Sequence, residues 1–271
     1  MKLEYVQKTL ADVLGEHPEY KKILLKFYHG LGDAIMFYAN CVPMLKRAFP
    51  GRRFYVETQL GQEYFFGEVD PDENHYDLCV FIAFPCAEWD EGPETKAEKC
   101  ARVELGIKIP TDVPSRYFIS PGREPSPLVG VHFVSTSNDG LSCPEPCARL
   151  IWDKIEQRGL IPVDTHFRHH GATLDRVIFT WETRNVQTVV RPTVEKLFGL
   201  MNALGGFAGV ASGNFWASLC TLPPSKILFI ETEFPVRKLT HIPICSIKAA
   251  DPDEAVIDAW LNEITEGMHH V

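Results

Sequence analysis

The apolar positions along this 271-residue chain follow two alternating patterns. Short continuous apolar runs are typical of buried strands, and longer stretches with apolar residues three and four positions apart are typical of helices. Strands and helices that alternate in this way favour crossover connections, and therefore an α/β fold with mostly parallel sheets. The predicted strands are 22–28, 53–57, 76–84, 128–134, 160–163, 207–210 and 227–230, and the predicted helices are 3–13, 34–50, 61–67, 93–105, 144–158, 193–204, 214–219 and one from Asp251 onwards.

One segment interrupts this alternation. Residues 109–127 are rich in proline and serine, which is typical of a linker. After the segment, the alternation of strands and helices starts again. The sequence therefore predicts two α/β domains of similar size, 1–122 and 123–271.

Composition and charge narrow the class of protein. The chain is 45% hydrophobic, which is enough for a sizeable core, and 27 Lys and Arg against 36 Asp and Glu give a net charge of −9. An acidic chain of this kind has no electrostatic basis for general nucleic-acid binding. The uncharged stretch between Lys196 and Lys226 exceeds the roughly 20 residues that cross a bilayer, but glycines and Pro223-Pro224 divide it. We therefore predict no transmembrane segment and no nucleic-acid partner.

The eight cysteines are predicted to be free thiols. Only Cys143 and Cys147 lie close together in the sequence, no second Cys or His pair follows at zinc spacing, and no signal peptide precedes them. Several cysteines lie within apolar stretches, where a thiol behaves as a small hydrophobic group. These features favour a reducing cytoplasmic location.

The most distinctive motif is His29-Gly30-Leu31-Gly32-Asp33, between a predicted strand and a predicted helix. Glycines allow a ligand to approach the backbone closely, and the carboxylate of Asp33 is at the carboxyl end of a strand, where α/β folds bind ligands. The position of the third glycine of a dinucleotide-binding motif is occupied by Ile35, which disfavours a nicotinamide-dependent oxidoreductase. The alternative is that Asp33 only caps the helix that follows it.

Three stretches resemble one known family, in the same order. ILLKFYHGLGDAIMFYANCVPMLKRAFPGRRFYVET looks like the opening of the family 9 glycosyltransferases, the ADP-heptose:lipopolysaccharide heptosyltransferases, at Gly30, Gly32, Asp33, Pro43 and Phe49-Pro50. LVGVHFVSTSNDG is similar to the strand and hydroxyl-bearing loop that open the second domain of that family. TVEKLFGLMNALGGFAGVASGNFWASLCTLPPSKILFI is similar to its helix, short strand, glycine turn, helix and closing strand.

The resemblance implies a fold and an activity. The implied fold is GT-B, in which two Rossmann-like domains face each other across a cleft. The implied activity is inverting transfer of a sugar from a nucleoside-diphosphate donor to the hydroxyl of a saccharide or glycolipid acceptor, with Asp33 as the general base. The resemblance calls for no metal ion and no cofactor. An acceptor of this kind adds a peripheral position at the inner membrane face to the expected locations.

The resemblance also assigns the donor-binding residues. Gly30 and Gly32 would lie beside the substrates, and the diphosphate would be held by hydroxyl and backbone N–H groups of Ser135, Thr136, Ser137, Ser212, Gly213 and Asn214. Trp216 occupies a donor-site position, from which its ring could stack on the base. The chain departs from the family at Ala211, where the family has Asp, at Trp216, where it has His, and in residues 138–143, which lack its basic residue. The alternative is therefore a non-catalytic relative that binds a saccharide or a partner protein.

Overall fold

The computed structural model describes residues 8–58, 63–83, 92–109, 125–134, 142–165, 193–233, 235–266 and 268. The chain divides into two compact units. The first comprises Met1–Ser115 together with Arg237–His241, and the second comprises Arg116–Val236 and Ile242–Val271. The predicted boundary between 122 and 123 falls outside the described residues and stays a prediction.

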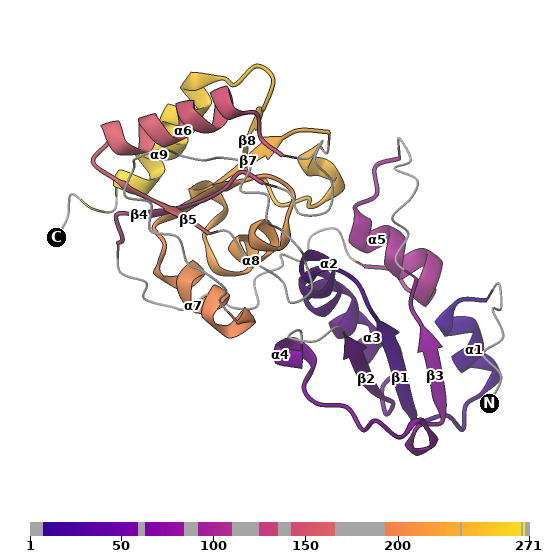
Figure 1. Ribbon diagram of the computed structural model, residues 1–271. Coiled ribbons are helices and arrows are strands. Elements are labelled where there is room, and N and C mark those ends of the chain that lie inside the picture. Colours follow the sequence, from indigo (N-terminus) through magenta and orange to yellow (C-terminus); the bar gives the residue numbers. More distant parts are fainter. Residues whose placement is uncertain are drawn as a thin grey trace. The chain divides into compact units, whose positions relative to one another are not determined.

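The N-terminal unit is built on a three-stranded parallel sheet of order β2-β1-β3 (Figure 1). Phe27 at the end of β1 stacks on Phe37 with ring centroids 4.4 Å apart, so the helices that follow β1 pack on that face of the sheet. The described elements are α1 (Leu10–Glu16), β1 (Lys22–Phe27), α2 (Leu31–Met36), the π-helix η1 (Phe37–Cys41), α3 (Val42–Ala48), β2 (Arg53–Thr58), α4 (Glu63–Phe66), the 3-10 helix η2 (Glu73–His75), β3 (Leu78–Phe81), α5 (Lys96–Cys100) and the π-helix η3 (Ala101–Leu105).

The predicted helix 34–50 forms with a change of winding in its middle. Pro43 has no N–H group and cannot continue a regular ladder of hydrogen bonds. The helix passes through the π-helical turn η1, in which the N–H of Val42 donates to the carbonyl of Phe37, and Pro43 then lies in the first turn of α3. Pro43 therefore marks a restart within one continuous helical segment.

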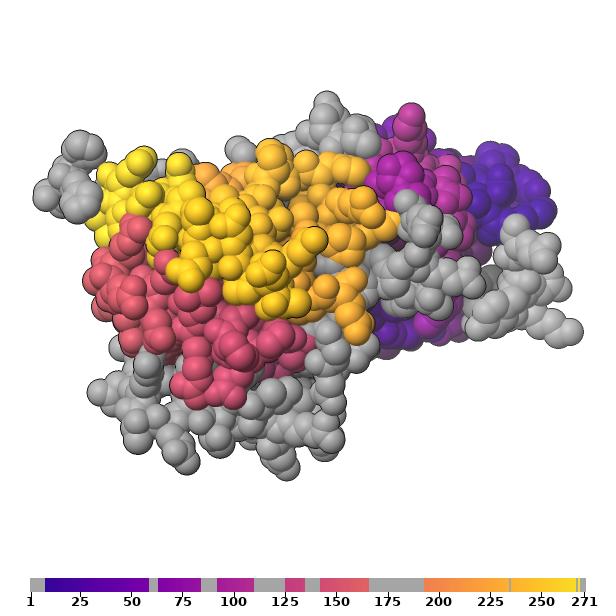
Figure 2. Space-filling model, turned by 90° about the horizontal axis from the view of Figure 1, so that it is seen from above, coloured from indigo at the N-terminus to yellow at the C-terminus, as the bar shows by residue number. Residues whose placement is uncertain are grey.

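The C-terminal unit contains a five-stranded parallel sheet of order β5-β4-β6-β7-β8. Helices α6 and α9 lie side by side on one face of the sheet (Figures 1 and 2), and α7 and α8 lie on the other face (Figure 1). The described elements are β4 (Leu128–His132), α6 (Glu145–Gln157), β5 (Ile161–Asp164), α7 (Val194–Ala203), β6 (Gly206–Gly209), α8 (Gly213–Thr221), the 3-10 helix η5 (Pro224–Lys226), β7 (Ile227–Glu231), β8 (Cys245–Lys248) and α9 (Glu254–Thr265). The 3-10 helix η6 (Val236–Lys238) begins in this unit, and its last two residues belong to the N-terminal unit.

The core of this unit lies between the sheet and the pair α6 and α9. Ile151, Trp152 and Ile155 of α6 and Trp260 and Leu261 of α9 are buried against the strands. Lys154 of α6 donates to Asp258 of α9 over 2.9 Å and ties the two helices together at the surface. The prediction of an α/β fold with mostly parallel sheets is confirmed.

Candidate functional site

The glycine motif follows β1, the strand at which the strand order of the N-terminal sheet reverses. The chain leaves β1 and builds β2 on one side and β3 on the other, and in open α/β sheets the carboxyl ends of the strands at such a switch point are where ligands bind. There, His29 Nε2 donates to the carbonyl of Ile82, which follows β3, over 2.9 Å. The sequence therefore brings the motif to the edge of the sheet where ligands bind in folds of this kind.

Asp33 does not cap the helix that it precedes in the motif. Gly30 is the N-cap of α2, without a side-chain hydrogen bond, and Asp33 lies within the first turn. The carboxylate instead accepts a hydrogen bond at Oδ1 from Lys96 Nζ of α5, over 2.6 Å. The two side chains are 21% and 15% exposed, so the ion pair is largely shielded from water. Lys96 was not found by sequence reasoning, because no motif or period relates it to Asp33.

The second oxygen of Asp33 faces Gly30. A Cβ atom built on Gly30 would lie 3.9 Å from Asp33 Oδ2, in van der Waals contact. Because glycine has no side chain, no side chain of residue 30 covers this oxygen of the carboxylate. One carboxylate oxygen is therefore held by a cation, and the other faces the backbone of Gly30.

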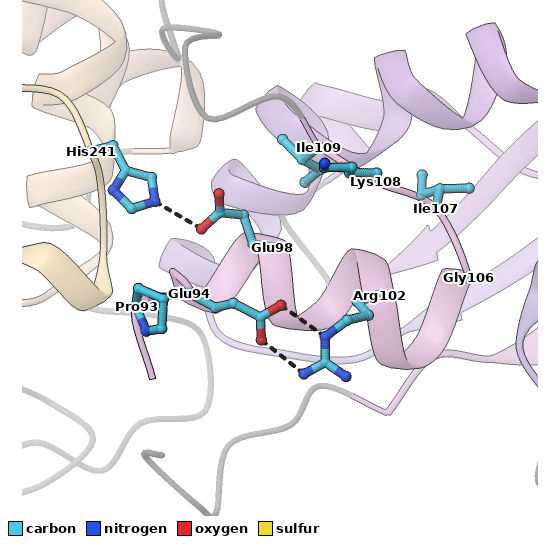
Figure 3. Close-up of a pocket in the computed structure, with 9 residues that line it drawn as sticks. All are labelled: Pro93, Glu94, Glu98, Arg102, Gly106, Ile107, Lys108, Ile109 and His241. Carbon is cyan, nitrogen blue, oxygen red and sulfur yellow. Dashed lines mark hydrogen bonds and ion pairs between the residues drawn. The ribbon is translucent and has the colours of Figure 1, made fainter. Parts of the chain in front are cut away.

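The opposite side of α5 borders a pocket of about 570 Å³ within the N-terminal unit. Glu98 of α5 accepts from the Thr95 backbone N–H over 2.7 Å, so it closes a capping box, and it also pairs with His241 Nε2 over 2.8 Å. Arg102 donates to both oxygens of Glu94 across the same hollow (Figure 3). Glu94, Glu98, Arg102 and His241 thus form two pairs on the wall of the pocket, which Lys108 also lines.

In the C-terminal unit, strand order reverses at β4, between β5 and β6. The turn Ser212-Gly213 follows β6 at this point, and Ser212 is the N-cap of α8, accepting from the N–H of Phe215 at Oγ over 3.2 Å. The first intrahelical bond runs from Trp216 N to Ser212 O, so the N–H groups of Gly213 and Asn214 precede the hydrogen-bond ladder. The role of this turn as an anion-binding helix start stays a prediction.

A buried polar cluster holds the turn Ser212-Gly213 and the start of α8 against the sheet. Asn214 Nδ2 lies 3.2 Å from His132 Nδ1, donates to Thr165 Oγ1 over 3.0 Å and also donates to the Thr165 carbonyl. Thr165 Oγ1 in turn donates to the carbonyl of Val131 over 3.1 Å. Asn214, His132 and Thr165 are 2%, 3% and 1% exposed. The cluster joins the carboxyl ends of β4 and β5 to α8.

The other residues predicted to bind the substrates differ in their burial, and three of them lie outside the described residues. Trp216 is 5% exposed and its ring lies 6.2 Å from that of Phe215, centroid to centroid. Ser135, Thr136 and Ser137 lie outside the described residues. Gly32 is the second residue of α2, half-buried beside Asp33. Stacking by Trp216 and the serine and threonine contacts stay predictions.

Two features of the described residues bear on metal and membrane binding. Among them, no cluster of His, Cys, Asp and Glu side chains has the arrangement of a metal site. None of the helices described is both long enough and apolar enough to span a bilayer.

The fold is similar to that of solved glycosyltransferases. The family 9 glycosyl transferase from Veillonella parvula matches with a TM-score of 0.62 and 12% identity, over 91% of this chain and 98% of that one. The Escherichia coli ADP-heptose LPS heptosyltransferase II matches with a TM-score of 0.59 and 13% identity, over 91% and 99%. Escherichia coli heptosyltransferase WaaC with ADP matches with a TM-score of 0.52 and 10% identity, again over 91% and 99%.

No protein-family model matches the sequence, and no curated protein matches it. At these identities the likeness is one of fold. The resemblance drawn from the glycine motif and the two later stretches is confirmed at that level. The chain therefore has the two-unit α/β fold of the family 9 glycosyltransferases.

Proposed function

We propose that the chain is an inverting glycosyltransferase that moves a sugar from a nucleoside-diphosphate donor to a hydroxyl of a saccharide or glycolipid acceptor. The observation that carries this proposal is the carboxylate of Asp33, which lies beyond the carboxyl end of β1 with Oδ1 bonded to Lys96 and Oδ2 facing Gly30. The fold of the chain, shared with family 9 glycosyltransferases, supports it. We assign the acceptor to domain 1–122 and the donor to domain 123–271.

In this proposal Asp33 is the general base. The acceptor hydroxyl donates a hydrogen bond to Oδ2, and its proton passes to the carboxylate as the oxygen forms a bond to the anomeric carbon. The bond between that carbon and the donor phosphate oxygen breaks on the opposite face, so the configuration inverts. Lys96 keeps the carboxylate in one orientation during the transfer, which makes it a positioning residue.

The leaving diphosphate requires hydrogen-bond donors. In the proposal these are the N–H groups of Gly213 and Asn214 at the start of α8 and the hydroxyl of Ser212, because a helix N-terminus attracts anions. Ser135, Thr136 and Ser137 would supply further hydroxyls. The side chain of Asn214 holds α8 on the ends of β4 and β5, so it supports the turn and presents only its backbone to the donor.

A second candidate function is a non-catalytic relative that binds a saccharide or a partner protein. The observation that favours it is the donor turn, where Ala211 replaces the acidic residue of the family and Trp216, which replaces its histidine, is 5% exposed. Without the acidic side chain and the histidine, the turn would bind a sugar-nucleotide donor less tightly, whereas Asp33 is still present.

The two functions are separated by a transfer assay on the purified chain. Wild-type protein is mixed with ADP-, GDP- and UDP-sugars and a panel of saccharide acceptors, and released nucleoside diphosphate and thermal stabilisation are measured. An enzyme releases diphosphate only with acceptor, and Asp33→Asn abolishes release while Glu16→Gln, a surface carboxylate on α1, does not. A chain that no nucleotide sugar stabilises and that releases no diphosphate is the binding protein.

A further inference from the structure

The N-terminal sheet has two chemically different faces. Side chains alternate along a strand, so Phe27 points to the face covered by η1, and Lys26 and Tyr28 point to the other. Lys26 is paired in register with Glu57 of β2 and with Phe81 of β3, which places those two side chains on the same face. All of these residues lie at the carboxyl ends of their strands, the end from which the Gly30 loop emerges.

Two aromatic rings on this face are exposed. Tyr28 is 37% exposed and Phe81 is 43% exposed, and their ring centroids lie 6.0 Å apart. Large aromatic side chains are usually mostly buried, and two neighbouring exposed rings offer an apolar surface to another molecule. We call Tyr28 and Phe81 the aromatic pair.

Hydrogen-bonding groups border the aromatic pair. The hydroxyl of Tyr28 donates to Glu57, and the ammonium of Lys26 lies 3.9 Å from Glu57 and pairs with Glu73. Partial burial and the neighbouring Glu57 carboxylate raise the pKa of Tyr28, so its hydroxyl stays protonated across the physiological range. Two carboxylates around one ammonium leave an excess of negative charge, which disfavours phosphorylated or acidic ligands here.

The aromatic pair lies near the proposed base. Tyr28 is two residues before Gly30, and two residues of chain span at most about 7 Å. Asp33 Oδ2 lies 3.9 Å from the Cβ position of Gly30. The Cα atom of Tyr28 is therefore within about 13 Å of Asp33 Oδ2, a separation that a saccharide of a few rings covers.

We propose that the aromatic pair is an acceptor subsite that stacks a neutral pyranose ring, with Glu57 and Lys26 bonded to the hydroxyl groups of that ring. One face of a pyranose carries C–H groups and packs on an aromatic ring, and its edge carries hydroxyls that bond to carboxylates and ammonium groups. The described surface offers both kinds of contact side by side, as specific small-molecule sites do. The proposal rests on the proposed function, because it names the acceptor as a neutral saccharide.

The experiment measures saccharide binding separately from transfer. Ligand-detected NMR follows the binding of six saccharides. Four are the methyl glycosides of glucose, galactose, mannose and N-acetylglucosamine, and the others are a β-linked glucose trisaccharide and the methyl glucuronide. The variants are Tyr28→Ala, Phe81→Ala and Tyr28→Phe. Tyr20→Ala is the matched control, since Tyr20 is an aromatic residue just before the opposite end of β1, stacked on His17. Folding of each variant is checked by its thermal unfolding.

We expect at least one neutral sugar to bind, and either alanine variant to weaken binding by about tenfold, the scale of one lost ring contact. Tyr28→Phe keeps most of the affinity because it keeps the ring, and Tyr20→Ala keeps all of it. The glucuronide binds less tightly than the matching neutral sugar. Where transfer is measured, the alanine variants raise the KM for acceptor and leave the KM for donor unchanged.

The two proposals fail in different ways. Neutral saccharides that bind through Tyr28 and Phe81 in a chain without transferase activity would support the subsite and overturn the enzyme. Transfer whose acceptor KM is the same in both alanine variants would support the enzyme and overturn the subsite. The subsite is also overturned if no neutral sugar binds, or if the glucuronide binds more tightly than its neutral counterpart.

Discussion

Lys96 Nζ and Asp33 Oδ1 lie 2.6 Å apart, although 63 positions separate these residues in the sequence. The ion pair joins the first turn of α5 to the first turn of α2. A shielded charge pair of this kind restricts the orientation of the carboxylate, because leaving either group unpaired costs desolvation energy. Helix α5 therefore belongs to the proposed site as much as the glycine motif does.

Replacing Lys96 by methionine should lower kcat of the proposed transfer by about a hundredfold, the loss typical of a catalytic group displaced by about 1 Å. The methionine fills the same space but leaves Asp33 Oδ1 without its donor. Initial rates at saturating donor and acceptor measure the effect. Lys96→Arg should restore most of kcat, because a guanidinium also donates to a carboxylate. Equal rates in wild type and Lys96→Met would show that the ion pair has no part in transfer.

Asn214→Ala should lower the free energy of unfolding by about 1–3 kcal/mol, the cost of leaving buried polar partners unsatisfied. The amide of Asn214 is the shared partner of His132 and Thr165, and all three side chains are buried. Denaturant unfolding measures the change. The control is Asn202→Ala. Asn202 is a half-buried residue of α7, and its replacement should change the free energy of unfolding by much less. A similar loss in both variants would contradict the role of the cluster.

Gly106→Ala and Gly159→Ala should differ in their cost although both glycines have a left-handed backbone, with φ of 66° and 71°. At Gly159 a Cβ atom meets nothing within 4 Å, so only the backbone strain of about 1 kcal/mol is expected. At Gly106 the Cβ atom would lie 2.2 Å from Thr9 Oγ1 and 2.8 Å from Ala11 Cβ, and we expect about 1–3 kcal/mol more. Unfolding curves that shift equally would show that α1 moves aside without cost.

His75 should titrate above the ordinary histidine range. Its hydrogen bond with Asp70 and the carboxylates of Asp70 and Asp72 raise the pKa of His75 above 6.5, and the same bond lowers the pKa of Asp70 below 3.8. The stabilising effect of the pair is therefore complete between about pH 3.8 and 6.5. It is lost above this window as pH rises through the folded pKa of His75, and below it as pH falls through that of Asp70.

An NMR titration of the His75 ring tests this order of effects. Asp70→Asn should lower the pKa of His75 more than Asp72→Asn, because the hydrogen bond to Asp70 is the larger cause of the shift. The reverse order would mean that the turn of η2 is arranged differently in solution.

Strands β1 to β7 could be predicted from the sequence because they are short continuous apolar runs between turn residues. β8 was missed, since Cys245–Lys248 has neither the length nor the apolar run of a buried strand and pairs only with β7. The π-helices η1 and η3 were also missed, because apolar spacing does not distinguish a helix that widens by one residue per turn. Pro43 was the visible signal for the first of them.

The candidate site was predictable only where its residues are neighbours in the chain. Gly30, Gly32 and Asp33 form one motif, and a glycine turn before a helix indicated Ser212 and Gly213. The partners of these residues come from other elements. Lys96 reaches Asp33, and Thr165 reaches Asn214, through tertiary contacts that no local pattern encodes.

The segment Arg237–His241 belongs to the N-terminal unit, although the residues on either side of it belong to the C-terminal one. Lys238 donates to the carbonyl of Gly92 over 2.5 Å, and Lys238, Leu239 and Thr240 are buried. In a fragment ending near residue 115, the surface against which these side chains pack would be exposed to water. Separate production of the two halves should give an N-terminal piece that aggregates until a peptide containing Arg237–His241 is supplied.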